Sequence, residues 1–239
     1  MLKTEYRILT NSDCFRAGKL LSRPRGIVVH STGVDQKRIS AYTRQWDRPG
    51  VRACVHGLLG LDDDGALCFV QTLPYEMRCW GCGSGAKGSF NDSHIQFEIC
   101  EMRGDGDWCR KTYAAALELC TNLCRLYGIP PEAVVCHSEA HALGYGSNHG
   151  DVMHWWPDFG LSMDGFRAEL KERLEEQPMK RIRTMEDVPA SLRPETEQLA
   201  AAGALRGKGG SAGLDLTEDM LRAIIICKRY ADRKAGETE

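Results

Sequence analysis

Side chains that can bind a metal ion are concentrated in one short segment, residues 134–158. The segment contains four of the seven histidines of the chain, and one aspartate lies among them. These residues are His137, His141, His149, Asp151 and His154. Three glycines and an asparagine in the same segment favour a loop that bends ligands around an ion. We interpret the segment as half of a zinc site.

The other half is expected from an early strand that ends in a histidine. In the sequence GIVVHSTG, His30 follows Ile27, Val28 and Val29. A run of β-branched residues after a glycine indicates a buried strand, and sites of α/β sheets gather at the carboxyl ends of strands. VVCH, at residues 134–137, repeats this pattern. Two parallel strands that each end in a histidine bring their imidazoles together at one edge of a sheet.

An acidic side chain lies in the middle of a third predicted strand. In SHIQFEICE, Glu98 falls on the opposite face from Phe97. Taken alone, a carboxylate at such a position is more often a solvated strand residue than part of a cleft. The strand pattern alone leaves open whether this carboxylate faces solvent or lines a cleft.

The remaining pattern predicts an α/β domain around these strands. Residues 62–65, DDDG, are typical of a hairpin turn, and His56 falls on the first strand of that hairpin. The strongest helix is expected to end at Gly128, ahead of Pro130. Strands are predicted at residues 51–61, 66–73 and 93–101, and helices at 39–46, 111–127 and 164–177.

Composition excludes several classes of protein. The chain has 239 residues, of which 42% are hydrophobic and 27% charged, and its net charge is −2. Such a balance gives no field that attracts nucleic acid or an anionic membrane. The first 19 residues lack a long apolar run, so we expect no signal peptide and accumulation in the cytoplasm. The eleven cysteines, including the CWGC pair Cys79 and Cys82, are expected to be reduced.

Two domains are predicted. Residues 1–177 form the α/β domain, and the Pro178-containing basic segment 178–184 is a linker. Residues 185–239 contain two helical patterns, separated by the glycine-rich GKGGSAG, and the second begins after Thr217. A small all-α module fits this pattern, for either surface binding or self-association.

Four blocks of the chain resemble those of a known family, in the same order. They are GIVVHSTG, VRACVHGLLGLDDDG, RCWGCGSGAKGSFNDSHIQFEICE and VVCHSEAHALGYGSNHGDVMHWWPDFG. They are similar to type-2 N-acetylmuramoyl-L-alanine amidases of the phage-lysozyme and peptidoglycan-recognition superfamily, and among these to clostridial-type phage and prophage endolysins. The resemblance implies a central mixed β-sheet flanked by helices and one catalytic Zn²⁺. It also implies hydrolysis of the bond between N-acetylmuramic acid and L-alanine in peptidoglycan.

The resemblance assigns roles to five residues of this chain. His30, His137 and Asp151 match the zinc ligands, which leaves one tetrahedral position for water. Glu98 matches the glutamate of the family's Ile-Gly-Ile-Glu strand, and implies a general base that orients the water and then protonates the leaving amine. His149 matches a lysine or histidine that stabilises the oxyanion.

The chain departs from the family pattern at two positions. Val152 stands where the family has a proline after the third ligand, and Gly81 stands where it often has a histidine after the tryptophan. We expect Trp80 to contact the substrate. We also expect His56 or His94 to make the substrate contact that the histidine makes in relatives.

Several alternatives remain at this point. His154 is the reserve third ligand, and His141 is expected to be structural. A non-catalytic peptidoglycan-binding module is the second functional hypothesis, and a cysteine hydrolase that uses Cys136 beside His137 is the third. For the favoured amidase, we expect synthesis in the cytoplasm, release to the wall at lysis, peptidoglycan as partner and a possible homodimer through the C-terminal module.

Overall fold

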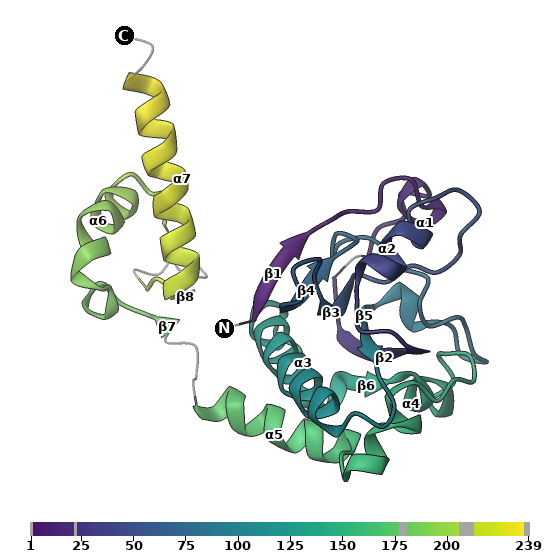
Figure 1. Ribbon diagram of the computed structural model, residues 1–239. Coiled ribbons are helices and arrows are strands. Elements are labelled where there is room, and N and C mark those ends of the chain that lie inside the picture. Colours follow the sequence, from purple (N-terminus) through teal and green to yellow (C-terminus); the bar gives the residue numbers. More distant parts are fainter. Residues whose placement is uncertain (1, 22, 177–180, 206–212, 237–239) are drawn as a thin grey trace. The chain divides into compact units, whose positions relative to one another are not determined.

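The computed structural model divides the chain into two compact units, Met1–Glu175 and Glu176–Glu239 (Figure 1). The structure describes residues 2–21, 23–176, 181–205 and 213–236. Residues 178–180 of the expected linker and most of the glycine-rich GKGGSAG segment lie outside the described residues.

Unit 1 is built on one mixed sheet of six strands, in the order β1-β4-β3-β5-β2-β6. Every neighbouring pair is parallel except the hairpin β3–β4, which the DDDG turn connects. The strands are β1 Lys3–Tyr6, β2 Gly26–Asp35, β3 Gly57–Leu61, β4 Leu67–Gln71, β5 His94–Glu101 and β6 Val134–Cys136. This arrangement confirms the expected mixed sheet flanked by helices.

One face of the sheet carries the hydrophobic core. Ile27 and Val29 of β2 and Phe97 of β5 point to this face, and none of the three exposes any surface. They pack with the long helix α3, Gly106–Tyr127, which runs along the sheet in Figure 1. The alternation of strand side chains therefore sends the residues between them to the other face.

The opposite face of the sheet carries the polar side chains of β2 and β5. His30 lies next to Glu98 in the parallel register of the two strands, and Val28 lies next to Gln96. Val28 packs with Cys82 and Ala140 of the segments that cover this face. The sheet thus separates an apolar core on one side from candidate functional residues on the other.

Short helices complete unit 1. The α-helices besides α3 are α1 Asp13–Arg16, α2 Ser40–Trp46, α4 His137–Ala142 and α5 Met163–Glu176. The 3-10 helices are η1 Phe90–Asp92, η2 Pro131–Ala133, η3 Asp151–His154 and η4 Trp156–Phe159.

Some element boundaries differ from the sequence predictions. Strand β2 continues past His30 to Asp35, with an irregular register after Ser31. Helix α3 begins five residues earlier than predicted, because Asp105 accepts a hydrogen bond from the Trp108 backbone N–H at 2.9 Å and caps the helix. Residues 51–56 are not part of β3, and the lead-in contains the edge strand β1, which the sequence did not predict.

Unit 2 is mainly helical, with a small apolar core of its own. Its helices are η5 Met185–Asp187, η6 Ala190–Leu192, α6 Arg193–Ala201 and α7 Glu218–Gly236. Thr217 Oγ1 accepts from the Met220 N–H at 3.2 Å, as expected for the residue before α7. The module also contains a feature that the sequence did not predict, an antiparallel pairing of β7 Arg181–Ile182 with β8 Leu216–Thr217.

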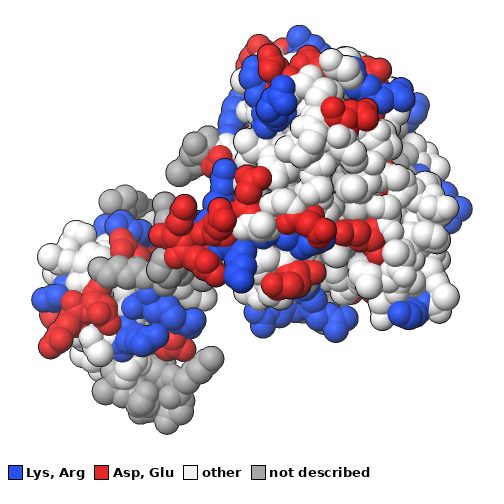
Figure 2. All heavy atoms as spheres, turned by 90° about the horizontal axis from the view of Figure 1, so that it is seen from below, with Lys and Arg blue, Asp and Glu red and all other residues white. Residues whose placement is uncertain are grey.

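The surface carries charges of both signs. Figure 2 shows basic and acidic side chains interspersed on the face that it presents, as the totals of 31 Lys and Arg and 33 Asp and Glu lead one to expect. None of the described helices has both the length and the apolar character that crossing a lipid bilayer requires.

Candidate metal centre

Three of the residues singled out in the sequence converge on one point. His30, His137 and Asp151 each offer a ligand atom, and these atoms lie within 4.8 Å of one another. All three side chains are buried, with 1%, 1% and 9% of their surfaces exposed. Among the described residues this is the one group of three or more that could hold a metal ion.

Three different elements deliver these side chains. His30 belongs to β2, and His137 is the first residue of α4, directly after β6. Asp151 opens η3 with φ of +47°, a left-handed conformation that aspartate tolerates better than most residues. The Ser31 N–H donates to Asp151 Oδ1 at 3.3 Å and holds the carboxylate over the end of the sheet.

The carboxylate of Asp151 lies between the two imidazoles. His30 Nδ1 is 3.2 Å from Oδ1, and His137 Nδ1 is 3.0 Å from Oδ2. Burial alone would raise the pKa of Asp151, but the hydrogen bonds with His137 and His30 outweigh it and hold the pKa well below its usual range. The aspartate is therefore a carboxylate at neutral pH.

The donor set fits a catalytic zinc ion. Two imidazoles and one carboxylate leave a fourth tetrahedral position open, as in hydrolytic zinc sites. The outer nitrogen of each imidazole is also occupied, as zinc sites require. His30 Nε2 lies 3.0 Å from Gln96 Oε1, and His137 Nε2 lies 3.1 Å from Ser147 Oγ.

Glu98 lies beside this group and has a free acceptor atom. In the register of β2 and β5 it is the neighbour of His30. Its Oε2 atom is buried and has no hydrogen-bond partner among the described residues. Burial raises the pKa of Glu98 to about 7, although the nearby His30 lowers it. A carboxyl group with this pKa can both take up and release a proton near neutral pH.

The raised pKa of Glu98 predicts how stability depends on pH in the metal-free protein. Its ordinary pKa is 4.5, so the unfolded chain loses this proton before the folded protein does, at about 7. The contribution of Glu98 to stability is therefore fully present below pH 4.5 and is lost as pH rises through 7.

We expect Glu98→Gln to remove this loss. Between pH 4.5 and 8, the free energy of unfolding of the variant should improve relative to wild type by about 2–3 kcal/mol. Urea unfolding of chelator-treated protein at the two pH values measures this difference, with Glu172→Gln on the exposed side of α5 as the control. A difference that does not change with pH would show that the Glu98 pKa is ordinary.

The other histidines of the segment have separate positions. The His149 ring is exposed and meets the His137 ring edge-on, with centroids 4.7 Å apart. His154 Nε2 lies 2.9 Å from both carboxylate oxygens of Glu101, which is fully buried. His154 is thereby bound to β5 and is not a member of the metal-binding group. His141 Nδ1 contacts the Gly146 carbonyl at 3.2 Å.

His56 and His94, the two histidines expected to contact substrate, have different surroundings. His56 is fully buried, and both its nitrogens are bonded to backbone, Nε2 to the Met77 carbonyl and Nδ1 to the Gln96 N–H, each at 2.9 Å. His94 lies at the first residue of β5, four positions before Glu98, and its ring stacks on Phe90 with centroids 3.8 Å apart. Burial lowers the pKa of both histidines to about 4. The environment of His56 is that of a structural histidine. His94 also lines a hollow of about 570 Å³, so its contact with substrate stays a prediction.

Trp80 has a position that suits substrate contact. It lines a hollow of about 650 Å³ together with the basic side chains of Lys19, Arg52 and Arg78. Asn91 also lines this hollow, and it is linked to the metal-binding group through Gln96. The hollow therefore adjoins the residues that surround His30.

The cysteine-hydrolase hypothesis is not supported. The Cys136 side chain is buried, and burial raises the pKa of its thiol, whereas a nucleophilic cysteine needs a lowered pKa. Ten of the eleven cysteines are buried, including Cys79 and Cys82, and Cys227 is exposed. The ten buried cysteines behave as the small core residues that the sequence predicted, whereas the exposed Cys227, for which the same was expected, does not.

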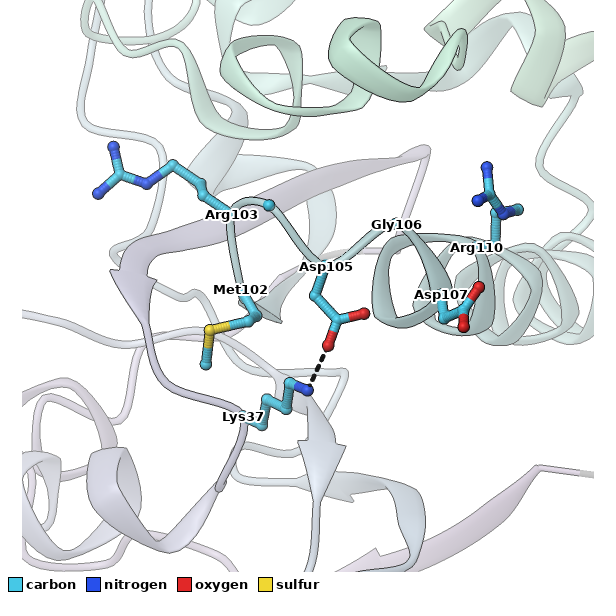
Figure 3. A pocket seen from close by; sticks show the side chains of 8 residues that line it. Lys37, Met102, Arg103, Asp105, Gly106, Asp107 and Arg110 are labelled. Atoms are coloured by element: carbon cyan, nitrogen blue, oxygen red, sulfur yellow. Dashed lines mark hydrogen bonds and ion pairs between the residues drawn. The ribbon is translucent and has the colours of Figure 1, made fainter.

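A second hollow, of about 600 Å³, lies at the start of α3 (Figure 3). Lys37 Nζ donates to Asp105 Oδ2 at 2.6 Å across it, while Arg103 and Arg110 extend away from this pair. None of the three metal-binding residues lines this hollow.

Sequence reasoning missed the residues that hold the two imidazoles. Gln96 and Ser147 contact the outer nitrogens, and Asn91 contacts Gln96. Gln96 carried the only usable signal, because an uncharged polar residue two positions before Glu98 falls on the same face of the strand.

Fold and site together define a class of protein. A mixed sheet flanked by helices carries a buried group of two imidazoles and one carboxylate, with a second carboxyl group beside it. This combination is typical of hydrolytic zinc centres. The family model described as N-acetylmuramoyl-L-alanine amidase, Amidase_2, matches residues 20–151. The chain therefore belongs to this family.

Solved structures of other proteins share the fold. PlyL is 20% identical over 71% of this chain and 96% of its own, with a TM-score of 0.55. The hydrolase AmiA of Staphylococcus aureus, solved in complex with its ligand, is 22% identical over 74% and 85%, with a TM-score of 0.56. A mutant endolysin from Bacillus subtilis is 24% identical over 71% and 99%, with a TM-score of 0.55. No curated protein matches the chain. The narrower likeness to clostridial phage endolysins stays a prediction.

Proposed function

We propose that this protein is a zinc-dependent N-acetylmuramoyl-L-alanine amidase that cleaves peptidoglycan and acts as a phage or prophage endolysin. The observation that carries the proposal is the convergence of His30, His137 and Asp151 beside Glu98, in a chain of the amidase family. A structural likeness to endolysins and to a bacterial hydrolase supports the same assignment.

In this proposal His30, His137 and Asp151 hold one Zn²⁺. When bound, the ion supplies Lewis acidity that polarises the scissile carbonyl and lowers the pKa of water towards about 7. The backbone N–H of Ser31 keeps the Asp151 carboxylate in position for this task. Burial of all three side chains keeps competing water away from them.

Glu98 moves the protons of the reaction. Its unpartnered Oε2 accepts a proton from the attacking water, whose oxygen forms a bond to the carbonyl carbon of the lactyl group. The bond between this carbon and the alanine nitrogen then breaks. Glu98 delivers this proton to the departing nitrogen, which gives a peptide with a free L-alanine amine. The second proton of the water stays on the new lactyl carboxylic acid, which releases it to solvent at neutral pH and becomes a carboxylate.

Two further residues have roles in the proposal. His149, exposed and edge-on to His137, stabilises the negative charge that develops on the carbonyl oxygen. Trp80, on the wall of the 650 Å³ hollow, provides a surface for the muramyl peptide. His56 is not part of the proposed substrate site, because both its ring nitrogens are bonded to backbone groups. His94, on the wall of a hollow of about 570 Å³, stays a proposed contact.

The alternative function, peptidoglycan binding without catalysis, has less support. Modules of that kind lack a ligand, most often the third, whereas Asp151 is present here and lies against both imidazoles. Wall binding or dimerisation by residues 185–239, and release to the wall at lysis, remain predictions of the endolysin assignment.

Digestion of purified peptidoglycan, followed by mass spectrometry of the products, tests the proposed function. We expect free stem peptides that begin with L-alanine, together with glycan strands that keep the lactyl group. Chelator should stop their release, and added Zn²⁺ should restore it. Cleavage within the glycan or between stem peptides would contradict the proposal, and binding without cleavage would select the recognition module.

A further inference from the structure

Two chains of hydrogen bonds start at the peptide groups of Cys82 and end at the outer ring nitrogens of His30 and His137. Cys82 belongs to the loop that covers the polar face of the sheet, and it is not a ligand itself. We propose that these two chains fix both imidazoles in the form that carries its proton on Nε2, so that Nδ1 of each binds the metal. The proposal rests on the proposed zinc function and concerns residues outside the ligand set.

The first chain begins with an asparagine whose amide has a fixed orientation. The Cys82 N–H donates to Asn91 Oδ1 at 2.9 Å, and Asn91 Nδ2 donates to the Gly83 carbonyl at 3.1 Å. A backbone N–H only donates and a backbone carbonyl only accepts, so the Asn91 amide cannot be turned over. Asn91 is buried to all but 5% of its surface, although it borders the 650 Å³ hollow, so its amide is held by these protein partners.

Gln96 transmits this orientation to His30. Gln96 Nε2 donates to Asn91 Oδ1 at 3.0 Å, so its Oε1 faces His30 Nε2, also at 3.0 Å. Gln96 exposes no surface. Since an amide oxygen carries no proton, His30 Nε2 must donate one, and the neutral ring keeps its lone pair on Nδ1. This is the atom that lies 3.2 Å from Asp151.

The second chain sets His137 in the same way. Ser147 donates to the Cys82 carbonyl with its backbone N–H at 2.9 Å and with its hydroxyl at 3.4 Å. With its proton so engaged, Ser147 Oγ accepts from His137 Nε2 at 3.1 Å. The lone pair of this ring is again on Nδ1, 3.0 Å from Asp151 Oδ2.

Gly81 leaves room for the first chain. A Cβ atom at this position would lie 2.6 Å from Gln96 Oε1 and 2.7 Å from Val55 Cγ1, both closer than Cβ atoms approach other atoms. Any side chain at position 81 would therefore displace the carboxamide that accepts from His30. The space beside Gly81 belongs to Gln96, and neither His56 nor His94 fills it.

Without the acceptor oxygen of Gln96, the His30 ring can also adopt the other tautomer. Its proton can move to Nδ1 and bond to Asp151, so that metal binding has to break this bond first. Loss of such an outer partner typically weakens metal affinity by about 10–100-fold. A neutral replacement of similar length, Gln96→Met, removes both the acceptor and the donor while filling the same volume.

The test measures the Zn²⁺ affinity of the full chain by competition with a chromophoric chelator. We expect Gln96→Met to weaken binding by about 10–100-fold. Gln71→Met is the matched control, because Gln71 is a buried strand glutamine that bonds to the Leu73 carbonyl and belongs to neither chain. It should bind Zn²⁺ as wild type does. Gln96→Glu, which restores an acceptor towards His30, should restore the affinity.

A spectroscopic signature accompanies these affinities. In the zinc-loaded protein, the ring Nε2–H of His30 should give a slowly exchanging NMR signal, and this signal should disappear in Gln96→Met. Ser147→Ala should remove the corresponding signal of His137. This variant tests the second hydrogen-bond chain and changes the side chain less than Gln96→Met does.

Different failures have different meanings. If wild type binds no Zn²⁺, the proposed function itself is wrong. A second outcome is that wild type binds Zn²⁺ and that the folded variants Gln96→Met and Ser147→Ala bind it as tightly as wild type does. In that case the proposal on the two hydrogen-bond chains is wrong, and the amidase assignment stands. Equal weakening by Gln96→Met and Gln96→Glu would assign the effect of Gln96 to packing and would also overturn the proposal.

Discussion

Asp151→Ala is expected to lose zinc and peptidoglycan hydrolysis together. The aspartate lies between both imidazoles, and its removal leaves two neutral ligands for a dication. The loss of zinc affinity should exceed the roughly 10–100-fold that follows removal of an outer partner. Zinc content after gel filtration, and release of peptides from purified peptidoglycan, measure the two effects.

Asp158→Ala is the control for this variant, because Asp158 is an exposed aspartate of the same segment. It should retain zinc and activity. An Asp151→Ala protein that keeps stoichiometric zinc would remove Asp151 from the ligand set, and His154 would then be the remaining candidate in the segment.

Glu98→Gln is expected to keep zinc and lose turnover. The amide has nearly the shape of the carboxyl group but cannot take a proton from water, and loss of a general base commonly costs about 10²–10⁴-fold in rate. Initial rates of peptide release and metal analysis of the same preparation measure the two properties. Glu172→Gln is again the matched control.

Near-normal hydrolysis by Glu98→Gln would show that another group handles the protons. Joint loss of zinc and activity would instead assign Glu98 to the metal site itself. The two variants therefore separate the residues that hold the ion from the residue that moves protons.

The two histidine strands could be predicted from local pattern alone. His30 and His137 each follow a short run of β-branched residues, which buries the strand and brings its next polar residue to the edge of the sheet. The parallel pairing of β2 with β6 then brings the two rings together. Asp151 could not be found in this way, because several polar residues of the segment compete with it and its left-handed backbone is set by the tertiary fold.

Gln96 and His56 show what a single sequence leaves open. Gln96 falls on the same face of its strand as Glu98 by alternation, but the sequence does not indicate that a distant loop covers this face and buries the side chain. His56 was expected on the first strand of the hairpin. Strand β3 begins one residue later, and both nitrogens of the His56 ring are bonded to backbone groups. In both cases long-range packing, which local periodicity does not encode, decides the role.

The edges of the fold were also beyond local pattern. β1 is a four-residue strand with mostly exposed side chains, so it has no apolar alternation that would mark it. β7 and β8 have two residues each and lie far apart in the sequence. Their pairing depends on the tertiary fold of unit 2, which no local pattern indicates. The long, strongly periodic helix α3 was predicted, and only its first residues differ.

X-ray absorption spectroscopy at the zinc edge, on protein purified without added chelator, tests the metal centre most directly. We expect one Zn²⁺ per chain with two imidazole nitrogens, one carboxylate oxygen and one exchangeable oxygen from water. A chain that dissolves peptidoglycan without bound metal, or a zinc ion coordinated by cysteine sulfur, would contradict this account.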